Sequence, residues 1–127
     1  MHLWIHELVS KGMSDLRVPR VIGYDAETKT LRMEAVTGMS LADWFGEAFE
    51  AVPGRHIDSA RRFVRFLADN GVEHPDITGY NFMVDDGGNF YAIDFEHACF
   101  MASIDSLDDD FVRLFIDGID SWNTRFN

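Results

Sequence analysis

The sequence predicts a single α+β domain, and three observations lead to this prediction. The chain has 127 residues, a length that fits one domain with a substantial core. A strongly amphipathic helix is expected over residues 57–70, and segments with hairpin spacing flank it at 21–36 and 82–93. No internal repeat, linker or low-complexity stretch interrupts the sequence. We therefore expect one domain over residues 1–127.

The first forty residues predict a helix followed by a hairpin. Apolar side chains at helical spacing favour a helix over Leu3–Lys11, and Gly12 is a natural stop. Val21–Tyr24 and Leu31–Val36 have strand character and flank a polar turn, so we expect these two segments to pair. Gly38 is expected to break the second strand.

A second helix is predicted directly after this hairpin. Ser40 is a good N-cap, and Asp43 follows at the spacing of a capping box. We expect the helix to run from Leu41 through Phe49, because apolar residues continue at helical spacing that far. Pro53 and Gly54 are expected to end it.

The second half begins with the clearest helix, over residues 57–70. Its apolar residues recur every three or four positions, and Gly71 suits the C-cap. These apolar residues are Ile57, Ala60, Phe63, Val64 and Leu67. Phe82–Val84 and Phe90–Ile93 then predict a hairpin around a glycine-containing turn. Leu107–Trp122 predicts the last helix.

Composition limits the classes of partner. The formal net charge is −11, which repels nucleic-acid backbones and anionic membrane surfaces, so we expect neither as a partner. The same charge suits a divalent cation, a cationic substrate or a basic protein, and simple solubility explains it equally well. The single cysteine, Cys99, forms no internal disulfide and is expected to be a small buried residue. No signal peptide or membrane-spanning run is recognised, so a cytoplasmic location is expected.

One motif carries chemical information. Residues 74–81, HPDITGYN, fit the pattern H-x-D-(L/I)-x-x-x-N, and Asp94-Phe95-Glu96 follows after the predicted hairpin. This arrangement resembles the catalytic core of the protein-kinase-like superfamily, in which a catalytic loop, two short strands and a metal-binding motif follow one another. The alternative is that Asp76, Asn81 and Asp94 only cap turns. An unrelated metal-dependent hydrolase fits the spacing less well.

The resemblance implies a reduced kinase-like fold. Residues 1–37 would form a remnant of the N-lobe, with one helix and a hairpin next to the hinge, and residues 38–127 would form a helical C-lobe that carries the catalytic loop. The segment from residue 18 to 38 is most similar to small-molecule kinases such as the aminoglycoside and choline kinases. The resemblance also implies phosphoryl transfer, with Asp76 as the catalytic base. His74 is assigned to the catalytic group together with Asp76, as the residue that holds the loop together.

The same resemblance implies two cofactor-binding groups. Asn81, Asp94 and Glu96 would bind Mg²⁺ or Mn²⁺ through hard oxygen atoms. Glu34 and Val36 fall in the hinge segment and would contribute, together with Asn81 and Asp94, to binding ATP.

The resemblance has a gap at its start. The residues before the first predicted helix supply neither the glycine-rich loop of these kinases nor their strand lysine, and Lys11 and Lys29 lie on the wrong elements. We therefore expect a second copy of the chain or another protein to cover the nucleotide. The expected contact edge is apolar and comprises Trp4, Leu8, Val21, Ile22 and Met33.

Two functions follow as hypotheses. The first is a kinase-like phosphotransferase, favoured by the complete set of Asp76, Asn81 and Asp94. The second is a pseudokinase, a catalytically inactive module that binds and regulates a partner protein, favoured by the missing half of the nucleotide site.

Overall fold

A four-stranded sheet lies at the centre of the fold. The computed structural model describes residues 1–12, 16–95, 97–101 and 110–123. The strand order is β1-β7-β6-β4, with β1 at Leu16–Arg17, β4 at Gly38–Ser40, β6 at Phe82–Asp85 and β7 at Phe90–Ala92. β1 runs parallel to β7, and the other neighbours are antiparallel. The predicted hairpin of β6 and β7 is therefore confirmed as the middle of this sheet.

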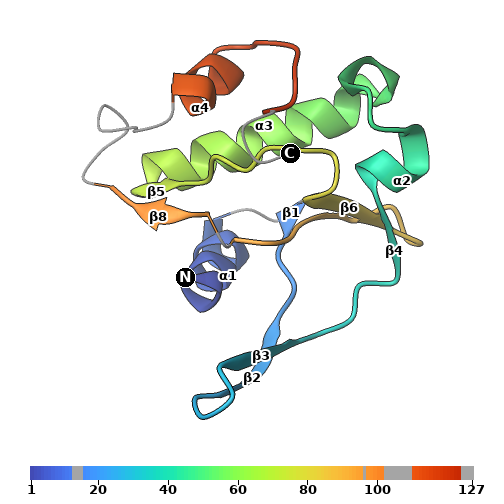
Figure 1. The fold of residues 1–127 in the computed structure, drawn as a ribbon. Helices are drawn as coiled ribbons and strands as arrows, with labels where there is room; N and C mark the ends of the chain where they lie inside the picture. Colours follow the sequence, from blue (N-terminus) through green and yellow to red (C-terminus); the bar gives the residue numbers. More distant parts are fainter. Residues whose placement is uncertain (13–15, 96, 102–109, 124–127) are drawn as a thin grey trace.

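Helices cover both sides of the sheet. On one side, α3 (Gly54–Asp69) lies between the sheet and α4 (Asp110–Ile116), while α1 (His2–Gly12) lies on the other side beside β1 (Figure 1). The short α2 (Leu41–Phe45) follows β4, and a 3-10 turn, η1 (Phe49–Ala51), leads into α3. No helix in the described ranges has the length and apolar character needed to span a bilayer.

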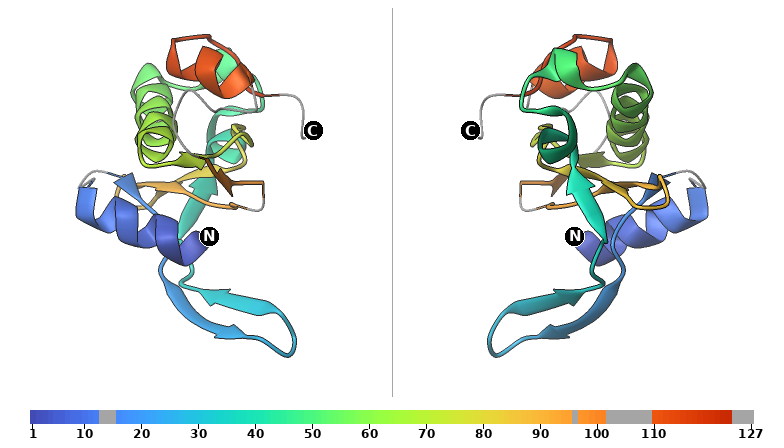
Figure 2. Two further views of the ribbon diagram at one scale, coloured as in Figure 1. Left: turned by 90° about the vertical axis from the view of Figure 1, so that its left-hand side faces the viewer. Right: turned by 90° about the vertical axis from the view of Figure 1, so that its right-hand side faces the viewer.

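Two small two-stranded sheets complete the fold. β5 (Val72–Glu73) pairs with β8 (Cys99–Phe100), and β2 (Val21–Asp25) pairs with β3 (Thr30–Met33). The β2–β3 hairpin projects away from the rest of the molecule (Figure 2). Its base is fixed by two bonds between Arg20 and Glu34: the Glu34 N–H donates to the Arg20 carbonyl at 2.9 Å, and the Arg20 N–H donates to the Glu34 carboxylate at 2.8 Å.

The apolar face predicted for the third helix forms the middle of the core. All five of its predicted apolar residues in α3 are buried. Phe63 is fully buried and lies near the rings of Phe82 and Phe95, with centroids 6.4 and 6.2 Å away. Burying a side chain of this size contributes roughly 2–3 kcal/mol to stability. This helix therefore joins the sheet to the segment that carries Asp94.

Three predictions about local structure are wrong. Gly38 does not end a strand but starts β4. A side chain at this position would meet the carbonyl oxygen of Val84, so glycine allows β4 to lie close to β6. The helix after Ser40 ends at Phe45 rather than Phe49, because Gly46 leaves helical geometry with φ of 97°. Cys99 is exposed rather than buried, because β8 is an edge strand of a two-stranded sheet.

The ends of the other predicted elements also shift. The α3 helix begins at Gly54, three residues before the predicted start. The last helix ends at Ile116 and not at Trp122, since Gly118 has φ of 113°, and its predicted beginning at Leu107 lies outside the described residues. The Ser40 N-cap is confirmed: its hydroxyl oxygen accepts a bond from the Asp43 N–H at 3.1 Å.

Candidate active site

The loop of residues 74–81 connects β5 to β6 and folds back on itself. The Asn81 side-chain N–H donates to the Asp76 carbonyl at 2.9 Å, and the Asn81 backbone N–H donates to the Thr78 carbonyl at 3.2 Å. All residues of the loop except Tyr80 are buried. A short loop with this much internal bonding holds Asp76 and Asn81 in one fixed arrangement.

The chain after α4 braces this loop from a distant part of the sequence. The Asn123 side-chain N–H donates to the Pro75 carbonyl at 2.6 Å, and its backbone N–H donates to the Ile77 carbonyl at 2.9 Å. Asn123 is buried, so these bonds form away from solvent, where unpaired carbonyl groups would be costly. The position of the loop of residues 74–81 therefore depends on the segment from 117 to 123.

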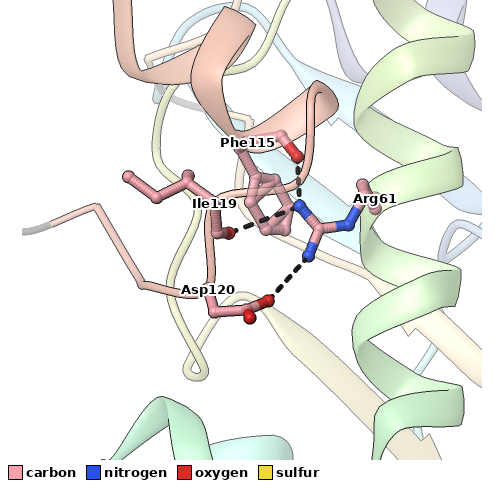
Figure 3. Close-up of polar contacts among 4 residues, drawn as sticks. All are labelled: Arg61, Phe115, Ile119 and Asp120. Atoms are coloured by element: carbon pink, nitrogen blue, oxygen red, sulfur yellow. Dashed lines mark hydrogen bonds and ion pairs between the residues drawn. The ribbon is translucent and has the colours of Figure 1, made fainter.

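Arg61 on α3 fixes that segment in turn (Figure 3). Its guanidinium donates to the carbonyl groups of Phe115 and Ile119 and pairs with Asp120 at 3.4 Å. The guanidinium also lies 4.7 Å from the centre of the Phe115 ring. The Arg61 side chain thus bonds to the carbonyl groups at and after the end of α4. It holds the segment that leads to Asn123 and the loop at 74–81.

A pocket of about 510 Å³ opens beside the loop. Asp76 and Asn81 line it together with Glu47, Tyr80 and Trp122. The Tyr80 hydroxyl donates to the Glu47 carboxylate, and this bond raises the pKa of Tyr80. The side chains that line the pocket include two carboxylates and no lysine or arginine. The pocket is therefore acidic and partly aromatic.

Asp94 lies close to Asn81 through the backbone. The Ile93 N–H donates to the Asn81 carbonyl at 2.9 Å, and Asp94 is the next residue. Asp94 is exposed and has a left-handed backbone with φ of 60°, which is uncommon for a residue other than glycine. Such strain often marks a functional position. The β6–β7 hairpin therefore brings Asn81 and Asp94 close together, at the end of the hairpin opposite its turn.

The hard oxygen atoms of these two residues suit a divalent cation. The Asn81 amide uses its N–H on Asp76, so its side-chain oxygen remains the group that a cation would meet. Within the described ranges, no three His, Cys, Asp or Glu side chains cluster closely enough to form a metal site. Glu96, the third predicted ligand, lies outside the described residues.

His74 points into the core rather than into the pocket. It is fully buried, and its ring lies 5.1 Å from Phe95 and 6.4 Å from Phe63. Neither ring nitrogen has a hydrogen-bond partner among the described residues. Burial lowers the pKa of His74 from 6.5 to about 4, although the charge of Asp94 opposes this shift. His74 is thus a neutral packing residue at neutral pH.

The two predicted hinge residues lie apart from the 510 Å³ pocket. Glu34 bonds to the Arg20 backbone, and the half-buried Val36 lies between β3 and β4. Sequence reasoning missed Arg61, Trp122 and Asn123, because they approach the site only in the folded chain. Tyr80 lies within the motif at 74–81, and nothing else in the sequence indicates that it lines the pocket.

Comparisons with known proteins place the fold. No protein-family model and no curated protein matches the sequence. The structure is similar to that of the kinase PK-1 from Cydia pomonella granulovirus, with a TM-score of 0.60 and 16% sequence identity. The match covers 80% of this chain and 39% of the viral kinase, so the chain spans about two fifths of that kinase's length. At this identity the likeness shows a kinase-like fold and no more, which agrees with the resemblance seen in the sequence.

Proposed function

We propose that the chain is a kinase-like phosphotransferase that moves the terminal phosphoryl group of ATP to a hydroxyl group. One observation carries the proposal: Asp76 and Asn81 line the same pocket, and a 2.9 Å bond fixes them relative to each other. The kinase-like fold supports it. A pair of turn caps needs no pocket, so the capping alternative explains this arrangement less well.

Asp76 is the proposed catalytic base. Its side chain is almost fully buried yet lines the pocket, so an acceptor hydroxyl in the pocket can approach the carboxylate. The carboxylate orients that hydroxyl and accepts its proton as the oxygen attacks the terminal phosphorus of ATP. The bond from that phosphorus to the bridging oxygen breaks, and ADP leaves. Positioning accounts for most of the rate enhancement in such reactions.

Asn81 and Asp94 are the proposed ligands for Mg²⁺ or Mn²⁺, with Glu96 as a third. The bound cation supplies charge neutralisation for the phosphate oxygens. The fixed amide of Asn81 supports this assignment, and so does the position of Asp94 next to Ile93, whose N–H donates to the Asn81 carbonyl. We assign Glu34 and Val36, between β3 and β4, to the nucleotide side of the site.

The test is transfer from labelled ATP in the presence of Mg²⁺, with a panel of hydroxyl compounds as acceptors. Asp94→Asn is the informative variant, because asparagine keeps the size of the side chain and tolerates φ near 60°. Asp86→Asn, on the exposed turn between β6 and β7, is the matched control. We expect Asp94→Asn and Asp76→Asn each to lower turnover at least about 100-fold, and Asp86→Asn to leave it unchanged. Equal turnover in wild type and Asp94→Asn would exclude the proposal. Absent transfer with tight binding to a protein would favour a pseudokinase.

A partner at the β2–β3 hairpin completes the proposal. An isolated two-stranded hairpin has little stability of its own, and this one exposes Ile22, Tyr24 and Met33. Trp4 on α1 is also exposed, whereas Leu8 and Val21 from the predicted edge are half-buried. We propose that a second copy or another protein covers this edge and the nucleotide. Light scattering that shows only monomer at micromolar concentration would exclude the homodimer.

A further inference from the structure

A second pocket, of about 410 Å³, lies between α1 and the β1 edge of the central sheet. None of its lining residues lines the 510 Å³ pocket of the candidate active site. We call it the arginine pocket. Its polar lining residues are His6, Ser10, Arg17, Arg20, Glu34 and Tyr91. The rest of its lining is apolar and buried.

The backbone directs these groups to one place. Arg17 on β1 is the register partner of Tyr91 on β7, so their side chains are neighbours on one face of the sheet. His6 and Ser10 are four residues apart on α1 and share one face of that helix. The backbone of Arg20 is fixed by its two bonds to Glu34. The residues that carry these donors therefore come from α1, β1, β7 and the segment before β2.

These donors have no protein acceptors in the part of the chain that the structure describes. Neither the Arg17 nor the Arg20 guanidinium makes a hydrogen bond or an ion pair there. Tyr91 is only 9% exposed, and its hydroxyl likewise has no hydrogen-bond partner among these residues. The arginines of α3 differ, since Arg61 bonds to carbonyl groups near α4 and Arg65 pairs with Asp69 at 3.8 Å.

Two carboxylates lie close to the arginine pocket, and both accept hydrogen bonds from backbone N–H groups. Glu34 lines the pocket, but one of its oxygens accepts the Arg20 backbone N–H at 2.8 Å. Hydrogen bonds from Asn89 and Gly87 lower the pKa of Asp85, and the nearby charge of Arg17 lowers it further. Two arginines that line one pocket are notable in a chain with 22 acidic and only 11 basic residues.

We propose that the arginine pocket binds the phosphate group of a small phosphorylated molecule. Phosphate presents three oxygens, which match two arginine forks and the hydroxyl groups of Tyr91 and Ser10 better than the two oxygens of a carboxylate do. The volume suits a small molecule, and the apolar lining suits the body of an ester. Glu34 is the one lining residue that the proposed function also uses, on the nucleotide side, and no other residue of this pocket belongs to the proposed phosphotransfer site.

Titration of the intact chain with inorganic phosphate, followed by calorimetry at low salt, tests the proposal. We expect saturable binding of one phosphate per chain. Arg17→Gln/Arg20→Gln should weaken binding by at least about tenfold, and Tyr91→Phe by about threefold, because charged hydrogen bonds are stronger than neutral ones. The matched control is Arg32→Gln/Arg55→Gln, which removes the same charge from exposed positions that line neither pocket.

The outcomes separate this proposal from its alternatives. No saturation at millimolar phosphate, or equal weakening in the Arg32→Gln/Arg55→Gln control, would overturn the site. Tyr91→Phe keeps the test decisive if the double arginine variant does not fold. Phenyl phosphate should bind at least as tightly as inorganic phosphate, and binding to phosphatidic acid vesicles without binding to phenyl phosphate would overturn the small-molecule assignment. Asp94→Asn should leave phosphate binding unchanged, so failure of the phosphotransferase proposal would not affect this result.

Discussion

His74 offers the sharpest test of how the loop of residues 74–81 is packed. Burial lowers its pKa from 6.5 to about 4, so the folded chain binds a proton at this site less readily than the unfolded chain does. The stability that neutral His74 supports is therefore complete above pH 6.5 and is lost as the pH falls toward 4. Linkage gives a loss of about 2 kcal/mol at pH 5 from this group.

Replacing His74 with leucine removes that loss. Because neither ring nitrogen has a hydrogen-bond partner among the described residues, His74→Leu should be as stable as wild type at pH 7, or more stable. Its advantage over wild type should grow by about 2 kcal/mol between pH 7 and pH 5. Urea unfolding followed by tryptophan fluorescence at both pH values measures this difference. His74→Met is a second apolar variant. A constant difference between wild type and both variants would refute the packing argument.

Two further predictions concern the supports of the site. Arg61→Ala should lower the free energy of unfolding by about 2 kcal/mol, because two carbonyl groups lose a charged donor, whereas Asp120→Ala should change it by less than about 0.5 kcal/mol since that side chain is 82% exposed. Urea unfolding measures both, and equal losses would contradict the assignment. Gly38→Ala should cost about 3 kcal/mol or more, because its methyl group would collide with the carbonyl oxygen of Val84, whereas Gly54→Ala meets open space and should be neutral or stabilising. Equal melting temperatures would disprove the close approach of β4 to β6.

The sequence predicted the elements whose pattern is local. The α3 helix was recognisable because its apolar side chains form one face, and the β6–β7 hairpin because its turn contains two glycines. The prediction for Gly38 was wrong because it used only the tendency of glycine to interrupt strands. Here the absent side chain allows the β6 backbone to approach, and that contact depends on residues far along the chain.

The residues of the candidate site also fall into two groups, those that a local pattern predicts and those that meet only in the folded chain. The spacing of Asp76 and Asn81 is local, so the motif identified both. Asn123, which braces the loop, acts on Pro75 from 48 residues away, and no short pattern predicts such a bond. The arginine pocket was missed for the same reason, since Arg17 and Tyr91 meet only when β1 pairs with β7.

Calorimetric titration of the chain with ATP, with and without Mg²⁺, tests the central claim most directly. The phosphotransferase proposal predicts that Mg²⁺ strengthens ATP binding by at least about tenfold and that Asp94→Asn removes this gain, because its carboxylate is a proposed ligand. Asp86→Asn should retain the gain. ATP binding that is equal with and without Mg²⁺, or a gain that persists in Asp94→Asn, would contradict the claim.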